Sequence, residues 1–340
     1  MTITIDAFKW RSMTAAINQL PKTPRLLQDM VFRTRNTNPT ETIDVDIIKG
    51  GRKILPFVRN DAAGTIIEKL TGEMRSVKAP RLRPKKPFTA TELLTQRGPG
   101  KIVYANGGDV TAERNRKIGQ ELADLKNRVD TTIEFMCAQA LQGSYSVSND
   151  GYNFSIDFQM PSAHKPVLGS GSGWNESGGN IMDDIDTWAT LIRNATGLAP
   201  DIALCGSAVV KALRDNAEVR ELLDNRRTNA GTFTWKASND YIGNLNGIDL
   251  YRYGMEYQDL AGADQNFLDA NKFVLISTQA RFSVEFALIL DLDAGAAIQG
   301  EYFSKSWLEK DPSVLFMLAE SRPLPVPWQP EAIVYADVIV

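Results

Sequence analysis

The sequence predicts an α+β protein in which helices and sheets are organised around one long helix. Two observations carry this prediction. A helical spacing of apolar residues runs without a break through residues 109–142, and strand-like segments alternate with helix-like segments from about residue 181 onward. The chain has 340 residues, which is the length of two domains or of one elaborate domain.

Residues 1–42 are predicted to form an N-terminal arm. Thr14–Leu20 has the composition of a short helix that Pro21 ends, and a second apolar patch follows at residues 26–32. The stretch RTRNTNPTET after it is polar and typical of turns. A segment this short does not bury its own apolar side chains, so another part of the molecule or another molecule must cover them.

Residues 43–100 are predicted to form an extended loop. TIDVDIIKG, which begins at Thr42, alternates as a strand does. Farther along, a basic run without any acidic residue contains Arg75, Lys78, Arg81, Arg83, Lys85 and Lys86. Pro80, Pro84 and Pro87 exclude a regular helix there, so we expect a long projecting hairpin or loop with a basic tip. Three interpretations stay open for these cations: a solvated face, a contact with an acidic protein neighbour, or a contact with phosphate.

Residues 109–142 are predicted to form one amphipathic helix. Its apolar residues follow at steps of four, three, four, four, three and four: Ile118, Leu122, Leu125, Val129, Ile133, Met136 and Ala140. Asp109 or Thr111 can cap the first turn, and Gly143 suits a left-handed position after the last turn. At 1.5 Å per residue the helix is roughly 50 Å long. It is either the core helix of one domain or a spine that connects distant parts of an extended protein.

A hairpin and a flexible connection are expected after the long helix. Residues 144–158 alternate as two strands around the turn Asn149-Asp150-Gly151, and their aromatic face is expected to pack on the helix. Residues 161–180 are rich in Gly and Ser, which indicates a mobile connection at a domain boundary.

A compact α/β unit is predicted next. It begins with a helix at 181–197, followed by a buried strand at 200–205 and a helix at 207–225 that Ser207 caps. Further strands follow, of which the last in this group is 273–277. The alternation of strand and helix is typical of a layered α/β unit.

The chain closes with two strand-like runs, SVLFMLAES and EAIVYADVIV, on either side of the Pro-rich RPLPVPWQP. A strand at the end of the chain implies that the tail is tied into a sheet. We expect this sheet to be the one beside the long helix, so that the chain leaves the first domain near residue 180 and returns near residue 300.

Composition narrows the function. The formal net charge of −3 argues against a dedicated nucleic-acid binder, although a local basic patch is compatible with it. No apolar run approaches the ~20 residues of a membrane span, and the first residues lack the apolar region of a signal peptide. Cys137 and Cys205 both lie among apolar residues, so we expect no disulfide framework, which fits a reducing compartment.

Residues that could support catalysis are few. His164 is the single histidine and lies in a loop rich in Ser, Gly and Pro, which is a poor support for a catalytic geometry. The glycines of GSGSG at 169–173 lack the Lys-Ser/Thr pair and the preceding strand of a phosphate-binding loop.

Two groups of acidic residues were considered as metal ligands. Asp183, Asp184 and Asp186 open a predicted helix, where acids favour the helix dipole in any case. Asp291 and Asp293 lack a third suitably spaced acid. The sequence therefore predicts no catalytic, cofactor or metal site.

Several motifs recur in the order of one known family: Asp224-Asn225-Arg226-Arg227 after a helix, Ser277-Thr278-Gln279-Ala280-Arg281 after a strand, DLDA at 291–294, and the closing DPSVLFMLAESRPLPVPWQPEAIVYADVIV. The predicted regions also follow a characteristic order along the chain: an arm, a projecting basic loop, a long helix, an inserted α/β unit and long closing strands. In both respects the chain resembles the capsid proteins of tailed bacteriophages, and more closely the lambda-type major head protein family, which has the HK97-like fold. The similarity covers nearly the whole length.

The resemblance implies four regions. These are an N-terminal arm at 1–42, an extended loop at 43–100, a peripheral domain at 101–180 and 300–340 that contains the spine helix 109–142, and an axial domain at 181–299.

The resemblance also implies a structural protein and not an enzyme. Such chains form hexamers and pentamers that close into an icosahedral shell around double-stranded DNA. The implied partners are the protein itself, scaffold, portal and decoration proteins, and packaged DNA contacted without sequence specificity; no membrane and no cofactor are implied. The location would be the virion, and before assembly the host cytoplasm.

Two hypotheses concern assembly. The cations from Arg75 to Lys86 are expected to meet an acidic patch on the adjacent subunit, and the Gly-rich residues 169–180 are expected to act as a hinge between shell states. Two other functions stay open. An encapsulin-like compartment would share the fold and enclose enzymes, and a soluble hydrolase would use His164 or a metal.

Overall fold

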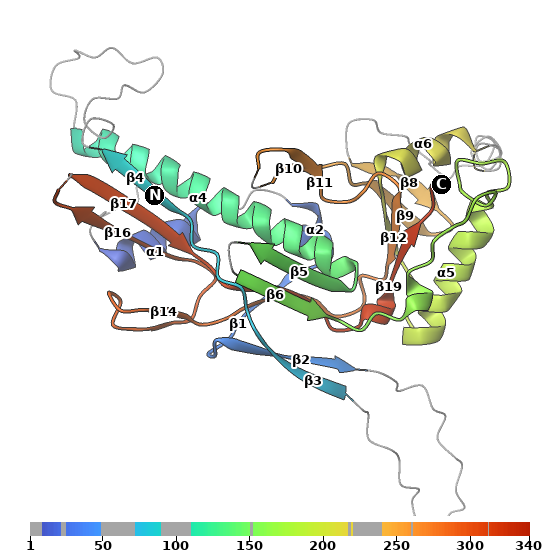
Figure 1. The fold of residues 1–340 in the computed structure, drawn as a ribbon, viewed down its shortest axis with the longest axis horizontal. Coiled ribbons are helices and arrows are strands. Elements are labelled where there is room, and N and C mark those ends of the chain that lie inside the picture. The colour runs from blue at the N-terminus through green and yellow to red at the C-terminus, as the bar shows by residue number, and fades with distance from the viewer. Residues whose placement is uncertain are drawn as a thin grey trace, which may run out of the picture.

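The computed structural model is an elongated molecule of mixed helix and sheet (Figure 1). It describes residues 9–21, 25–48, 72–89, 110–149, 152–216, 219, 240–259, 261–311 and 313–340. The long helix α4 runs along one half of the molecule, an α/β unit forms the other end, and the hairpin of β2 and β3 extends away from both (Figure 1).

Helix α4 spans Val110–Leu141, which confirms the predicted long helix. All seven residues of the predicted stripe are at most 2% exposed. Gly143 has a φ of +79°, and a Cβ there would lie 2.5 Å from Met160 Cβ, so the turn after the helix requires glycine. The proposed cap Asp109 lies outside the described residues, and Thr111 is already inside the helix. Helices α1 and α2 and strands β5, β17 and β18 all contact α4, so the helix acts as a spine.

Small sheets surround the spine. One has the order β16-β17-β4, with bounds Phe303–Glu309, Val314–Glu320 and Lys85–Thr89. A second has the order β1-β13-β18, with bounds Thr34–Thr37, Phe282–Phe286 and Pro323–Pro327. The predicted hairpin after the helix is confirmed as β5, Ser144–Asn149, and β6, Tyr152–Asp157, and its buried Phe154, Ile156 and Phe158 belong to the same core as the α4 stripe.

Three more two-stranded ribbons are present. The strands are β2 and β3, Thr42–Ile48 and Gly72–Lys78; β10 and β11, Glu256–Gln258 and Asp264–Asn266; and β14 and β15, Ile289–Asp291 and Ala296–Ile298. Two short 3-10 helices, Ser162–His164 and Pro330–Ala332, also lie within the described residues.

The α/β unit contains a five-stranded sheet in the order β19-β12-β7-β9-β8. Its strands are Ile333–Asp337, Lys272–Ile276, Ile202–Cys205, Ile248–Arg252 and Tyr241–Leu245. Strand β12 joins two hydrophobic cores, because Val274 and Ile276 face the core around α4, whereas Phe273 and Leu275 face the core under the helices of this unit.

Helices α5, Ile181–Thr196, and α6, Ser207–Asp215, belong to this unit (Figure 1). Asn180 caps α5 by accepting from Asp183 N at 3.2 Å, and Gly197 follows it with a φ of +78°. Ser207 is the first residue of α6, and the capping position is held by Gly206. The predicted helix 207–225 is wrong in its length, because α6 ends at Asp215 and Asn216 has an extended backbone with a ψ of 130°. Asn216 Oδ1 instead accepts from Val219 N at 3.2 Å. The motif at 224–227 lies outside the described residues.

The tail differs from the prediction. Strand β17 lies in a sheet that contacts the spine, as expected, but β19 pairs antiparallel with β12 in the five-stranded sheet. Ile333–Tyr335 are buried on successive positions, so this strand needs a sheet that is covered on both faces, and the α/β unit provides one. Strand β13 lies within the predicted axial range 181–299, yet it pairs with β1 and β18 beside the spine.

The arm folds onto its own chain. Helix α1, Trp10–Gln19, packs on β16, and α2, Leu26–Met30, packs on α4. The stretch after them was predicted to be turns, but Thr34–Thr37 forms β1, which pairs in parallel with β13. Pairing between strands uses main-chain hydrogen bonds and does not depend on apolar side chains, so a polar segment can also form a strand. Met13, Ile17, Leu27 and Phe32 are completely buried within this one chain, so here another part of the molecule covers the arm.

The second half of the Gly-rich connection, from Gly173 to Gly179, is packed closely, whereas the sequence predicts a mobile segment. Trp174 is buried against Trp188 and Phe273 and donates from Nε1 to Asp184 at 2.8 Å. A Cβ on Gly179 would lie 2.4 Å from the carbonyl oxygen of Gly173. Gly178 and Gly179 therefore allow close backbone packing, whereas Gly169 and Gly171 have open space around them.

Replacing Gly179 with Ala should destabilise the protein, because the new Cβ has no space beside the Gly173 backbone. We expect a loss of about 1–3 kcal/mol in the free energy of unfolding, measured by denaturant titration. Gly169→Ala is the matched control, since a Cβ there meets nothing within 4 Å. Equal stability of the two variants would contradict the packed arrangement.

Candidate functional site

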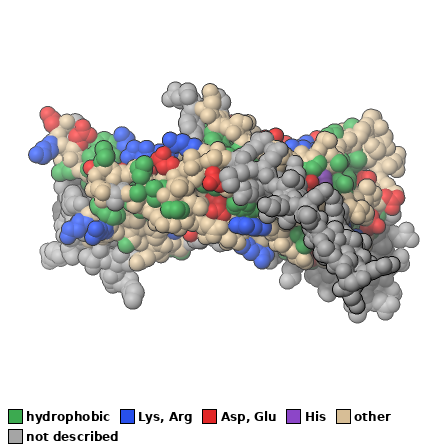
Figure 2. Space-filling model, turned by 90° about the horizontal axis from the view of Figure 1, so that it is seen from below, with side chains coloured by type: hydrophobic (Ala, Val, Ile, Leu, Met, Phe, Trp, Pro, Cys, Tyr) green, Lys and Arg blue, Asp and Glu red, His purple; other side chains and the backbone are tan. Residues whose placement is uncertain are grey.

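The basic run does not form the tip of a hairpin. Strand β3 pairs with β2 and carries the chain back toward the body, and β4 then pairs with β17. Between them Leu82 exchanges backbone hydrogen bonds with Ser321, at 2.9 and 3.0 Å. The run is therefore the return leg of the β2–β3 hairpin, anchored on a sheet beside the spine. Figure 2 shows Lys and Arg side chains in separate groups along the underside of the molecule, with acidic groups among them.

Arg81 and Arg83 both bind Glu320, whose side chain is completely buried. Arg81 makes a two-point contact from Nε and Nη2, the latter 2.9 Å from Oε2, and Arg83 Nε lies 3.1 Å from the same oxygen. The hydrogen bonds that Arg81 donates to Glu320 raise the pKa of Arg81. Arg83 also approaches Asp291 at 3.6 Å. Two guanidinium groups thus neutralise one carboxylate that has no contact with water.

Lys86 attaches β4 to the spine. Its Nζ donates to Glu121 Oε2 at 2.8 Å and to Asp124 Oδ2 at 2.5 Å, and both acids lie on α4. The hydrogen bond from Lys86 lowers the pKa of Asp124. The cation therefore serves an intramolecular contact in this structure.

The remaining cations of the run are more exposed. Lys78 has a side chain that is 65% exposed, with Nζ 3.5 Å from Glu41 Oε2. Lys85 is exposed and lies over the Phe316 ring, 5.0 Å from its centroid. The backbone of Arg75 belongs to β3, but its side chain lies outside the described residues. Contact of the run with a neighbouring subunit stays a prediction.

The arm is held by a buried carboxylate of the spine. Glu134 is completely buried, accepts the backbone N–H of Leu27 at 2.9 Å and of Gln28 at 3.3 Å, and accepts from Tyr253 Oη at 2.9 Å. It therefore caps α2 from another helix, because these N–H groups lie in the first turn of α2 and have no partner within it. Burial raises the pKa of Glu134.

A second set of polar contacts holds α1 and β16. Lys126 Nζ donates to the carbonyl oxygens of Ile17 at 3.1 Å and Leu20 at 2.7 Å, at the end of α1. Tyr302 Oη donates to Asp130 on the spine. Burial raises the pKa of Asp130, as it does for Glu134. Charged groups of α4 thus satisfy the backbone ends of the arm helices.

The residues considered for catalysis have structural partners. His164 is buried, and its Nδ1 donates to the carbonyl oxygen of Ile333 at 2.8 Å. Lys305 Nζ lies between Asp291 and Asp293, 2.8 and 2.5 Å from their carboxylates. Asp183 belongs to the cap of α5. Within the described residues no three His, Cys, Asp or Glu side chains are grouped as metal ligands would be.

The two cysteines are buried and unpaired, as expected for packing residues. Burial raises the pKa of both Cys137 and Cys205. None of the helices in the described part of the chain is long and apolar enough to cross a membrane.

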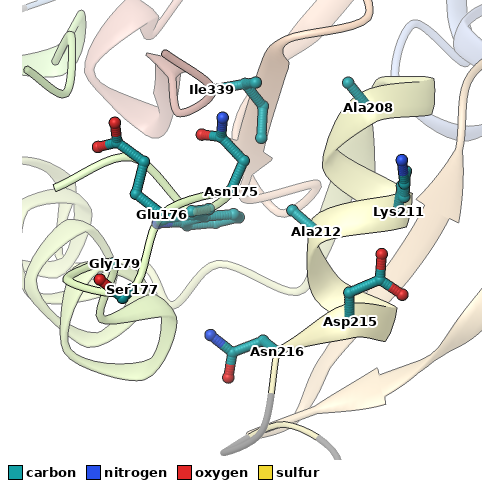
Figure 3. A pocket seen from close by; sticks show the side chains of 11 residues that line it. Asn175, Glu176, Ser177, Gly179, Ala208, Lys211, Ala212, Asp215, Asn216 and Ile339 are labelled. Atoms are coloured by element: carbon teal, nitrogen blue, oxygen red, sulfur yellow. The ribbon is translucent and has the colours of Figure 1, made fainter. Parts of the chain in front are cut away.

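A cavity of about 850 Å³ lies in the α/β unit between the Gly-rich segment and α6 (Figure 3). Asn175 and Glu176 face Lys211 and Asp215 across it, and Ile339 closes one end (Figure 3). Among the described residues that line the cavity, charges of both signs lie on opposite walls and do not converge on one point as catalytic groups would.

Glu134, Glu320 and Arg322 are the important residues that sequence reasoning missed. Each is a charged residue beside an apolar run, in TTIEFMC or FMLAESRPL, and each is almost completely buried. A charge in such a position needs a partner when it is buried, and this signal was available in the sequence.

Comparison with known proteins identifies the relatives of this chain. The family model described as phage major capsid protein E matches residues 9–338. The major capsid protein of Escherichia phage lambda is 24% identical over 325 residues, which cover 92% of this chain and 93% of that protein.

Two solved structures show the same fold. A prophage capsid protein of E. coli CFT073 has a TM-score of 0.74 at 19% identity and covers 97% of this chain and 98% of its own. A phage-related protein of Bordetella bronchiseptica RB50 has a TM-score of 0.55 at 13% identity, with coverage of 99% and 98%.

The raised pKa of Glu134 predicts a pH effect. The native carboxylate takes up a proton at a higher pH than it does in the unfolded chain, so this group adds stability as the pH falls from 7 to 5. Wild type should therefore gain stability relative to Glu134→Gln as the pH falls through the raised native pKa. The gain is complete only below the unfolded pKa, where it reaches about 1.4 kcal/mol for each unit between the two pKa values. Denaturant unfolding at both pH values measures the difference.

Asp124→Asn is the control for this experiment. The pKa of Asp124 is lowered, so its contribution is present above the pKa of the unfolded chain and is lost as the pH falls through the native pKa, below about 4. Its difference from wild type should stay constant between pH 7 and 5. A constant difference for Glu134→Gln as well would show that the buried carboxylate does not titrate as inferred.

Proposed function

This chain belongs to the phage major capsid protein E family, and we propose that it builds a shell from hexamers and pentamers of itself. It is the structural major capsid protein of a phage or prophage, it has the HK97-like fold, and its copies assemble into a closed shell. The hexamer and pentamer arrangement is the further step in this proposal.

The agreement of the fold over the whole chain carries the proposal. The prophage capsid structure aligns with 97% of this chain, so the similarity of fold extends over nearly its whole length. The shape is also suited to shell building, because an elongated subunit with a projecting ribbon presents different surfaces to different neighbours. Heterologous contacts of this kind close into rings.

Further partners belong to the same proposal. We expect a scaffold protein, a portal protein and a decoration protein to act with this chain, and packaged double-stranded DNA to contact the shell without sequence specificity. The chain would function in the virion after assembly in the host cytoplasm. We propose no catalytic role, because the family is structural and His164, Asp291 and Asp293 are engaged in intramolecular contacts.

The two alternatives are less well supported. An encapsulin-like compartment would share the HK97-like fold, but the family model and the curated relative are both phage capsid proteins. A soluble hydrolase would need a reactive site, and the cavity beside α6 does not offer converging catalytic groups.

The basic run supports a narrower proposal about contacts between subunits. Of the six predicted cations, Arg81, Arg83 and Lys86 are bound to acids of their own chain. Lys78, whose Nζ also lies 3.5 Å from Glu41 of its own chain, and Lys85 are exposed enough to contact an acidic neighbour. We therefore expect these two to carry the intersubunit contact, with Arg75 as the third candidate.

Electron microscopy of the protein, expressed alone and with the products of neighbouring phage genes, tests the proposed function. We expect closed shells with five-fold and six-fold clusters, and DNA that resists nuclease once packaging proteins are present. Shells that enclose a cargo enzyme would favour the encapsulin-like alternative. A monomer with hydrolase activity that never assembles beside its neighbours would contradict the proposal.

Reversing the charge of Lys78 and Lys85 together should weaken assembly. Each exposed ion pair contributes about 0–1 kcal/mol, but the loss is repeated at every copy in the shell. We expect a marked fall in shell yield, measured by light scattering, with the unfolding temperature almost unchanged. Neutral Lys78→Met/Lys85→Met should show an intermediate yield. Normal assembly of the reversed variant would refute the contact.

A further inference from the structure

The hairpin of β2 and β3 enters and leaves the body of the protein beside one tripeptide. This tripeptide is Glu320-Ser321-Arg322, at the end of β17. The incoming leg passes it at Thr40 and Glu41, just before β2 begins, and the outgoing leg passes it at residues 79–84, just after β3 ends. We call this tripeptide the root staple.

The outgoing leg is fixed by Glu320 and Ser321. Leu82 and Ser321 exchange both backbone hydrogen bonds, at 2.9 and 3.0 Å. Arg81 and Arg83 flank Leu82, and in an extended segment residues two apart point to the same side. Both guanidinium groups therefore reach the Glu320 carboxylate, one of them with two hydrogen bonds.

The incoming leg is fixed by Arg322. Its Nη1 donates to Glu41 Oε1 at 2.7 Å and to the carbonyl oxygen of Leu288 at 2.8 Å. Leu288 N in turn donates to the carbonyl oxygen of Thr40 at 2.9 Å. Lys78, at the end of β3, lies 3.5 Å from Glu41 and so links the two legs to each other.

The contacts of Glu320 and Arg322 are strong and directional enough to fix the angle between the hairpin and the body of the protein. The side chain of Glu320 is 0% exposed and that of Arg322 is 8% exposed, so each needs its partner to compensate for lost hydration. The hairpin base also packs through Ile43 and Val45, but apolar packing is not directional. Two-point hydrogen bonds of Arg to carboxylate restrict rotation as well as distance.

The angle at the root matters because the ribbon is a lever. Seven residue pairs join β2 and β3, which corresponds to a length of roughly 24 Å. A rotation of about 10° at the root would displace the far end by about 4 Å. A displacement of this size is enough to break a hydrogen bond made there. A two-stranded ribbon on its own is too weak to fix its direction.

We propose that Glu320 and Arg322 are positioning residues that set the angle at which the β2–β3 hairpin leaves the body, and thereby the place where it meets a second copy of this chain. The contact with a second copy rests on the proposed function in a shell. The angle itself is a property of the single subunit and can be measured without assembly.

Distances between two spin labels test the angle. Cys137 and Cys205 are 0% exposed, so labels can be directed to Met74→Cys, which is farther out on β3, and to Gln120→Cys at an exposed position on α4. Wild type should give one narrow distance distribution. Glu320→Gln and Arg322→Met should shift or broaden this distance distribution by several Å. Arg322→Lys keeps the charge but loses the planar donor set, so its distribution should lie between those of wild type and Arg322→Met.

Two further variants make the result decisive. Lys272→Met removes a comparable ion pair, 2.5 Å from Asp337, in the five-stranded sheet, and should leave the label distance unchanged. Glu41→Gln, at a less buried position, tests the incoming leg if Arg322→Met does not fold. An unchanged distance in Glu320→Gln and Glu41→Gln would overturn the proposal, whatever the change in unfolding temperature.

Assembly provides the second measurement. Variants with a shifted label distance should form fewer shells, or shells of altered diameter in electron micrographs, while their far-ultraviolet circular dichroism stays that of wild type. Normal shells from a variant with a shifted distance would refute the link between angle and neighbour. If wild type itself formed no shells, the proposed function would fail, and the label distances would still decide the role of the root staple.

Discussion

The structure depends on one constraint, which is that the apolar stripe of a 32-residue helix must be covered along its whole length. In the described part of the chain, no single neighbouring segment is long enough to do this. The chain therefore covers α4 with α2 from its beginning, with the hairpin that begins with β5, and with β17 and β18 from near its end. The helix becomes the place where distant parts of the sequence meet, and the elongated shape follows from its length.

Buried charges then fix how these segments attach. Apolar burial supplies most of the stability but tolerates sliding, whereas Glu134, Lys126 and Glu320 each have specific partners at defined distances. Each of these residues is costly if its partner is absent, so alternative arrangements of the arm or hairpin are disfavoured. Precise placement of limbs is valuable in a subunit that repeats the same contacts many times in a shell.

The parts of the fold that could be predicted from the sequence are those with a local signal. The spacing of the α4 stripe, Gly143 after the helix, and Asn180 before α5 all act within a few residues. Strand β1 carried no such signal, because Thr34–Thr37 pairs through its main chain with a partner about 250 residues away. The position of β19 depended on which of two sheets was covered on both faces, which the sequence of the strand does not specify.

The candidate site also combines a feature with a local sequence signal and features that depend on distant residues. The basic run was recognisable from composition, because six cations stand there without an acid. Their partners were not, since Glu320 and the spine acids Glu121 and Asp124 are distant in the sequence and one carboxylate can serve two arginines. The close packing of Gly178 and Gly179 could not be predicted, because glycine permits both free motion and close backbone contact. The burial of Trp174 beside them becomes visible only in the structure.

The contact between α1 and β16 has a consequence for synthesis. Thr14 Oγ1 donates to the carbonyl oxygen of Ser304, a partner 290 residues later in the chain. The first helix therefore emerges from the ribosome long before the strand that buries its apolar face has been translated. During that interval the nascent chain carries an uncovered, aggregation-prone segment, and protection by a chaperone would favour its folding.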